Sequence, residues 1–165
     1  MREPIKTLTL TDDAPVVVLA ELPGDLQVSG SESMAVSILA DDDHGISLEL
    51  DAEGRVQVRA GGDAVLRLPA NASLEVRAVR GDARIQGIGG RLDIAEVNGD
   101  LKLRDVGPCR IGRVYGDLRA NAVNGDLAVE AVFGDAAVRA VRGTVTLDRV
   151  QADALVRDVD GTVVV

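Results

Sequence analysis

Glycine recurs through the second half of the sequence at a nearly constant interval of nine residues. It stands at positions 81, 90, 99, 107, 116, 125, 134, 143 and 161, with one interval of eight and with Ala152 in the missing place. The repeating unit reads L-x-V-x-x-V-x-G-D, most clearly at 118–126 (LRANAVNGD) and 127–135 (LAVEAVFGD). A fixed short period is typical of architectures that stack one small unit on itself.

The residues two, four and seven places after each glycine are apolar throughout 83–159, as in Leu118, Ala120 and Val123. This alternation marks a strand with one buried face, and the step from the fourth to the seventh place requires a bend or bulge. Gly-Asp then turns the chain, since Gly permits positive φ and Asp bonds nearby backbone. Stacked copies bury a face that a single copy cannot. We predict an all-β, single-stranded parallel β-solenoid (β-helix) with about 18 residues per rung and rungs about 4.8 Å apart.

Two other fold classes fail on particular points. A helix needs apolar residues at a spacing of 3.6, which the Val-x-Gly-Asp segments interrupt. An antiparallel sandwich has turns of varied length, whereas this turn recurs at a fixed period. Aromatic residues are 1% of the chain, with one Tyr, one Phe and no Trp. A core without rings is narrow and regular, as a two-sided coil requires.

Residues 1–73 are less periodic but also read as strands. The candidates are 5–10, 15–20, 25–29, 35–39, 46–50, 55–59 and 64–68, separated by turns such as Pro23-Gly24-Asp25 and Gly61-Gly62-Asp63. We expect one domain over 1–165, in which 1–73 forms irregular coils that cap the regular half-rungs of 74–165.

The order of these segments resembles a known family. A strand ending in Leu-Pro at 65–69 (VLRLP) is followed by 74–76 (LEV) and then by a series of Gly-Asp-Leu or Gly-Asp-Ala corners. Over residues 15–165 this is similar to the putative-adhesin domain of unknown function common in bacteria, a β-solenoid family. The resemblance implies an envelope-associated protein, and it carries no catalytic residues over to this chain.

Charge and cysteine content exclude several classes of protein. The net charge is −9, which opposes general binding of nucleic acid because phosphates are neutralised by Lys and Arg. Cys109 is the single cysteine, so no intrachain disulfide forms, and its inward slot makes it a core residue. The first residues contain no apolar signal segment and no run spans a membrane, so we expect a cytoplasmic chain as given, without a cofactor.

One corner of the predicted coil stacks aspartates. They are Asp82, Asp100, Asp117, Asp135 and Asp153. A carboxylate column suggests calcium, which takes six to eight oxygens, but the denser glycine loop of calcium-binding nonapeptide repeats is absent. Asp side chains that accept hydrogen bonds from turn amides are the simpler explanation. The run Asp41-Asp42-Asp43 beside His44, the single histidine, is interpreted as a solvated loop rather than a metal site.

The strand after the aspartate corner points cations outward. They are Arg84, Lys102, Arg104, Arg119, Arg139 and Arg157, with Asp105 and Asp158 nearby. We interpret this basic flank first as a surface ion-pair ladder. A site for a polyanion or a lipid headgroup is the alternative.

The two aromatic residues, Tyr115 and Phe133, occupy the same slot before a Gly-Asp corner, one rung apart. Neighbouring outward positions such as Ala131 and Ala137 are small, which predicts an exposed apolar patch. A stabilising aromatic stack explains the pair without a partner. A surface for a partner or for self-association is the alternative.

The sequence stops in mid-repeat at Val163, Val164 and Val165. An open coil end shows unpaired backbone and apolar core, so we expect self-association there, as an end-to-end dimer or a filament. No Gly-x-Ser-x-Gly motif and no phosphate-binding glycine loop is present. The predicted function is a non-enzymatic structural or interaction module. The alternative is a binding domain that uses the basic flank or the Tyr115/Phe133 patch for a polysaccharide, lipid headgroup or protein.

Overall fold

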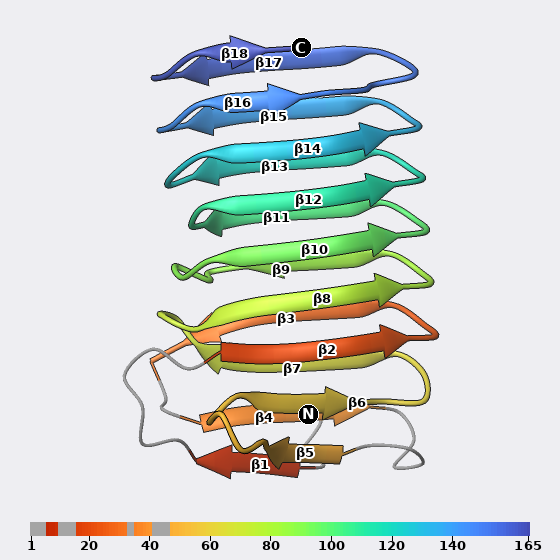
Figure 1. Cartoon of the computed structure of the whole chain (residues 1–165), viewed down its shortest axis with the longest axis vertical. Helices are drawn as coiled ribbons and strands as arrows, with labels where there is room; N and C mark the ends of the chain where they lie inside the picture. The colour runs from red at the N-terminus through yellow and green to blue at the C-terminus, as the bar shows by residue number, and fades with distance from the viewer. Residues whose placement is uncertain (1–5, 10–15, 33–34, 41–46) are drawn as a thin grey trace.

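The computed structural model describes residues 6–9, 16–32, 35–40 and 47–165. All secondary-structure elements among these residues are β-strands. The strands form two nine-stranded sheets that face each other across the molecule (Figure 1). The expectation of an all-β chain is therefore confirmed. No helix among the described residues is long and apolar enough to cross a membrane.

Among the described residues, seven strands precede the regular repeat, and each lies within two residues of its predicted bounds. They are β1 (Lys6–Thr9), β2 (Val16–Leu22), β3 (Leu26–Ser31), β4 (Ala35–Ala40), β5 (Ser47–Leu50), β6 (Val56–Arg59) and β7 (Ala64–Pro69). Alternating apolar residues and the intervening Gly-Asp turns were sufficient to locate them. The acidic run at 41–43 and His44 lie outside the described residues.

The repeat region supplies the other strands. They are β8 (Ser73–Val79), β9 (Ala83–Gln86), β10 (Leu92–Val97), β11 (Leu101–Val106), β12 (Cys109–Val114), β13 (Leu118–Val123), β14 (Leu127–Val132), β15 (Ala136–Val141), β16 (Val145–Leu147), β17 (Ala154–Val159) and β18 (Val163–Val164). From β9 onward, each strand begins two residues after its corner glycine or the residue in that place, as the period requires.

Consecutive strands from β8 onward alternate between the two sheets. Sheet A has the order β1-β4-β7-β3-β9-β11-β13-β15-β17, and sheet B has the order β18-β16-β14-β12-β10-β8-β2-β6-β5. Each of these strands therefore pairs in parallel with the strand two places along the chain. The register joins like slots, as in Leu92 with Cys109 and Cys109 with Leu127. These pairs are 17 and 18 residues apart (109 − 92 and 127 − 109), because one repeat has eight residues instead of nine.

Apolar side chains fill the space between the sheets. The slots two, four and seven places after each glycine are buried through Leu147, and no polar side chain among the described residues is buried. A fully buried Val or Leu contributes about 1.5–3 kcal/mol, so the repeated slots are the main source of stability. Because each slot faces a similar slot of the opposite sheet, branched aliphatic residues fill the core without aromatic rings.

The predicted bend within each unit is a backbone irregularity of defined position. In sheet A, positive φ occurs at the sixth residue after the corner glycine or the residue in its place. These residues are Asp105 (51°), Ala122 (59°), Ala140 (58°) and Asp158 (55°). The register omits this residue, since Arg104 pairs with Asn121 and Val106 with Val123. The sheet B register instead omits the fifth residue, at Ala95 and Gly112. This skip returns the seventh residue to the core.

The corner glycines are needed for space and not, as the sequence suggested, for positive φ. Positive φ among described glycines occurs at Gly54 and Gly87, neither of which precedes an Asp corner. A Cβ on Gly116 would collide with Oδ1 of Asp100 and with the carbonyl of Gly99. The Gly116 amide donates to that same carbonyl at 3.1 Å. Successive corners thus approach so closely that the position excludes any side chain.

The first part of the chain does not wind in chain order. The coil formed by β2 and β3 lies between the coil of β6 and β7 and the coil of β8 and β9. β4 and β5 pair antiparallel with β7 and β6, and β1 pairs antiparallel with β4. These strands lie at the N-terminal end of the stack (Figure 1). The expected irregular coils are therefore interleaved strands with antiparallel edges.

We call the coil of β2 and β3 the inserted coil. The link from β7 to β8 passes this coil at Ala70. The Ala70 amide donates to the carbonyl of Ser31 at 2.9 Å, and its carbonyl accepts from the Gly89 amide at 2.6 Å. A Cβ on Gly30 would collide with the Gly87 carbonyl and approach Cα of Ala70. The crossing therefore depends on glycines that belong to two distant segments.

Candidate functional site

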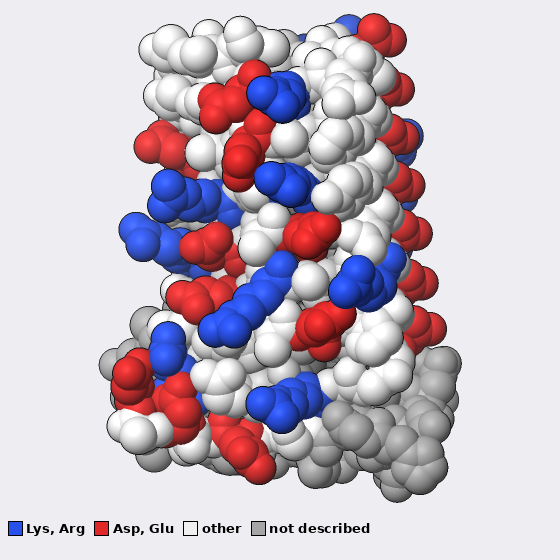
Figure 2. All heavy atoms as spheres, turned by 45° about the vertical axis from the view of Figure 1, so that its right-hand side comes forward, with Lys and Arg blue, Asp and Glu red and all other residues white. Residues whose placement is uncertain are grey.

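The aspartate corner forms a continuous hydrogen-bonded ladder. Oδ1 of each Asp accepts the backbone N–H of the next Asp along the stack, at 2.7–3.0 Å, in the order Asp63, Asp25, Asp82, Asp100, Asp117, Asp135 and Asp153. Acidic side chains run in a column along the right-hand edge of Figure 2. We call the seven aspartates that are joined by these hydrogen bonds the aspartate ladder. Each Asp bonds the neighbouring copy rather than its own turn, so the ladder joins successive coils.

Two members of the ladder were not predicted. Asp25 and Asp63 lie in turns that the sequence marks as Pro23-Gly24-Asp25 and Gly61-Gly62-Asp63, but nothing local places these turns above one another. Their alignment depends on the inserted coil, which brings Asp25 between Asp63 and Asp82.

Calcium binding at Asp82, Asp100, Asp117, Asp135 and Asp153 is the less favoured interpretation of this column, and it stays an untested alternative. One oxygen of each ladder carboxylate that has a following member is engaged by a backbone amide. Among the described residues, no three acidic, His or Cys side chains cluster as metal ligands would. The observed hydrogen bonds give the ladder a structural role at every corner.

The rings of Tyr115 and Phe133 stack at a centroid distance of 4.9 Å and an interplanar angle of 3°. They are 41% and 36% exposed, so the slot faces solvent as predicted. The backbone sets this spacing, because the Phe133 amide donates to the Val114 carbonyl and the Tyr115 amide to the Val97 carbonyl. Each ring covers one face of the other, so that face of each ring cannot contact a partner.

The alanines expected around the rings do not extend this surface. Ala131 is buried, with 9% of its surface exposed, and is in register with Arg113. Ala137 lies across the corner in β15, in register with Arg119 on sheet A. The exposed apolar patch at this corner therefore consists of the two rings.

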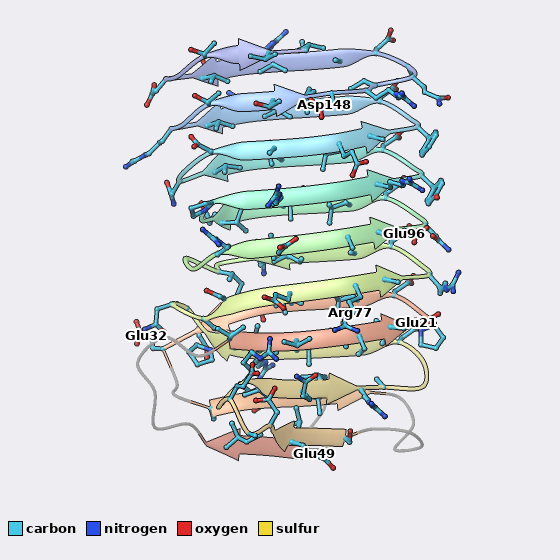
Figure 3. The ribbon with its side chains drawn as sticks, in the orientation of Figure 1. Glu21, Glu32, Glu49, Arg77, Glu96 and Asp148 are labelled. Carbon is cyan, nitrogen blue, oxygen red and sulfur yellow. The ribbon has the colours of Figure 1, made fainter. Side chains whose placement is uncertain are left out.

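Arg80 occupies the slot before the same corner two coils below Tyr115, and it joins the coil of β2 and β3 to the repeat. Its Nε and Nη2 donate to Oε1 of Glu21 at 3.0 and 2.8 Å. These hydrogen bonds raise the pKa of the Arg80 guanidinium, with a further contribution from the charge of Glu96. Figure 3 shows Glu21 and Glu96 at the right-hand ends of β2 and β10. This exposed pair is a contact between the two regions of the chain.

The expected ion-pair ladder on the basic flank is reduced to one contact. Among the described residues, the salt bridge on this flank joins Arg139 Nε to Asp158 Oδ2 at 3.7 Å, between side chains that are each 70% exposed. The in-register neighbours of Lys102 are Arg84 and Arg119, so like charges face one another. The ion-pair interpretation of the flank is therefore wrong for most of its members.

The C-terminal coil, residues 154–165 with strands β17 and β18, leaves its core slots open. Val145 is fully buried, whereas its in-register neighbour Val163 is 43% exposed. Val164 and Val165 are 51% and 72% exposed. β17 and β18 each pair on one side only, and their outer edges carry unpaired backbone groups.

Cys109 and Asp51 have structural surroundings. Burial raises the pKa of the Cys109 thiol to about 12, and the thiol donates to the Gly107 carbonyl at 3.2 Å. A thiol of this kind is unreactive, as a core residue should be. The Asp51 carboxylate accepts hydrogen bonds within the β5–β6 turn. These bonds lower the pKa of Asp51, and the bond from the Gln57 side chain contributes more than the bond from the Arg55 amide.

Comparison with known proteins gives structural neighbours. No family model and no curated protein matches this chain. A putative cell adhesion protein from Clostridium sporogenes is 10% identical over 98% of this chain and 100% of its own, with a TM-score of 0.35. A putative adhesin from Parabacteroides merdae is 11% identical over 97% of this chain and 96% of its own, with a TM-score of 0.25. Both neighbours come from bacteria, and both are described as putative adhesion proteins.

Proposed function

We propose that this chain is a non-enzymatic structural and interaction module. In this proposal it is a rigid, adhesin-like β-solenoid with about 18 residues per rung that self-associates through its C-terminal coil. The alternation of strands between two sheets and the 18-residue separation of hydrogen-bonded ladder members support the solenoid. One domain over 1–165 is part of the same proposal, since strands from both halves of the chain contribute to each sheet.

The observation that carries self-association is the difference between equivalent slots. Val138 and Val145 are 2% and 0% exposed, while Val156, one coil further on, is half-buried and Val163 is 43% exposed. A second copy placed end to end would bury these slots and pair the free edges of β17 and β18. A twofold arrangement places the same coil on both sides, so the contact closes as a dimer.

Analytical ultracentrifugation of the full chain tests this proposal. We expect a species of twice the 17.2 kDa chain mass at concentrations up to roughly 300 µM, since association follows mass action. Val163→Lys should restore the single-chain mass, because it places a charge in the buried contact. Ala128→Lys, on an exposed position of β14, is the matched control and should leave the dimer intact. A wild-type chain that stays monomeric over this range would contradict the proposal.

The second candidate function is ligand binding by the cationic surface of sheet A. The observation that favours it is the set of exposed cations on that sheet, of which only Arg139 has a salt bridge among the described residues. The Tyr115 and Phe133 rings carry no comparable argument, since their mutual stacking explains their position.

A further inference from the structure

Six cations stand in two columns on the outer face of sheet A. We call them the basic face. One column contains Arg84, Lys102 and Arg119 in register on β9, β11 and β13, and the other contains Arg104, Arg139 and Arg157 on β11, β15 and β17. All six side chains are exposed. Adjacent strands are about 4.8 Å apart, so cations on neighbouring strands lie at short intervals along the stack.

The fold does not require this arrangement. Like charges on directly paired positions destabilise a sheet. Within the described part of the chain, no acidic oxygen lies within salt-bridge distance of Arg84, Lys102, Arg104, Arg119 or Arg157. Sheet B differs, because there Asp93 pairs with Arg110 and Glu96 with Arg113. The chain is acidic overall, yet it places cations next to cations on sheet A and cations next to acids on sheet B.

Short side chains open a depression between the two columns. Asn121 interrupts the second column, and Ala137 follows Arg119, the last cation of the first. The shallow hollow above them has a volume of about 530 Å³. The cations around it are Lys102, Arg104, Arg119, Arg139 and Arg157. A guanidinium binds carboxylate or sulfate through two parallel hydrogen bonds, so the hollow is suited to anionic groups.

The margins of the basic face limit what can occupy it. Lys102 and Arg119 share a small surface hollow with Asp100 and Asp117 of the aspartate ladder, so negative charge borders the cations on one side. Asp105 and Asp158 follow the second column on the other side. An anionic membrane would meet these acids together with the cations. A single narrow chain that lies along the stack would meet mainly cations.

We propose that the basic face binds a linear acidic polysaccharide along the stack axis, with its carboxylate or sulfate groups held by the two cation columns. Single-stranded nucleic acid is disfavoured because such sites stack bases on aromatic side chains, and this face has none among its described residues. The proposal rests on the proposed function as a non-enzymatic interaction module, and it does not require self-association.

Binding of oligogalacturonate, measured by titration calorimetry at low ionic strength, tests the proposal. The double variant Arg119→Glu/Arg139→Glu should bind at least about tenfold more weakly, because it removes two cations and adds two anions. The matched control Arg110→Glu/Arg113→Glu changes sheet B and gives the same net charge, from −9 to −13 after two changes of −2 each. It should bind within about twofold of wild type, since local charge and not total charge decides binding.

Three results would overturn the proposal. They are a wild-type chain that binds neither oligogalacturonate nor dextran sulfate, equal losses in the two double variants, and tighter binding of poly-dT or phosphatidylserine vesicles. Arg119→Gln/Arg139→Gln is the second variant if the charge reversal unfolds the chain, and circular dichroism checks both. If glycan binding fails while the dimer persists in ultracentrifugation, this inference alone is lost. If the dimer fails while glycan binding persists, self-association alone is lost.

Discussion

The two regions of this chain form their sheets differently. From β8 to β18, hydrogen-bonded ladder partners are 17 or 18 residues apart, and every strand pair is parallel. Before β8, the corresponding separations are 38 and 57 residues, and three of the described strand pairs are antiparallel. A regular period specifies the neighbour of each strand, whereas the first region reaches its order through contacts between distant segments.

This difference has a kinetic consequence. Closing a loop of 57 residues costs more entropy than closing one of 18, although the increase is gradual. Contacts at short separation also form faster. We therefore expect coils of the repeat to form first and the inserted coil of β2 and β3 to join afterwards.

The largest expected effect comes from matched leucines in the two regions. Leu19 in β2 and Leu103 in β11 are 0% and 2% exposed, so either change to Ala should cost about 2–5 kcal/mol of unfolding free energy. Leu103→Ala should mainly slow refolding, and Leu19→Ala should mainly speed unfolding. Stopped-flow measurements in urea separate the two rates. The same division between rates for both variants would remove the kinetic difference between the regions.

A smaller effect is expected from glycines in the two kinds of turn. Gly116→Ala places a methyl group against Asp100 and the Gly99 carbonyl, and should cost about 1–3 kcal/mol. Gly62 lies in the open turn before β7, where an added Cβ would meet no atom within 4 Å, and Gly62→Ala should be neutral or stabilising by about 0.5 kcal/mol. Denaturant melts of both variants measure the difference. A neutral Gly116→Ala would show that close packing of the corners is not required.

The smallest effect concerns the backbone irregularity of the repeat. Ala140 has φ of 58°, so Ala140→Gly should stabilise the chain by about 1 kcal/mol. Ala131 occupies the same slot of the repeat in sheet B without positive φ, and Ala131→Gly should destabilise by about 0.5–1 kcal/mol. Opposite shifts in Tm are expected. Shifts of the same sign would contradict the assignment of strain to sheet A.

Much of the repeat region could be predicted from the sequence, because each unit contains the residues that determine its strand and its corner. The alternation identifies the core slots, and the position of Tyr115 and Phe133 before the corner predicts their exposure. The insertion of β2 between β6 and β8 could not be predicted, since no local signal records a partner 57 residues away. The role of the corner glycines was misread for a related reason: the clash that excludes a Cβ comes from the neighbouring coil.

The candidate sites divide in the same way. The column of five aspartates follows from the period, but Asp25 and Asp63 join it only through the inserted coil. Lys102 and Arg119 were correctly predicted to point outward. The predicted ion pairs do not form, because the acids two residues earlier, Asp100 and Asp117, lie along the margin of the basic face. Burial of Ala131 was not predicted, because its place in the repeat is an outward one.

Spin-label distances along the outer face of sheet B test the interleaved stack most directly. Gln57 is two strand steps from Glu75 through Val18, and Glu75 is four steps from Thr146. At about 4.8 Å per step, Glu75 and Thr146 should be about 19 Å apart, and Gln57 and Thr146 about 29 Å apart. Double electron–electron resonance should therefore give a difference of about 10 Å between the two pairs. A difference of about 5 Å would mean that β6 is next to β8, and would contradict the insertion of β2.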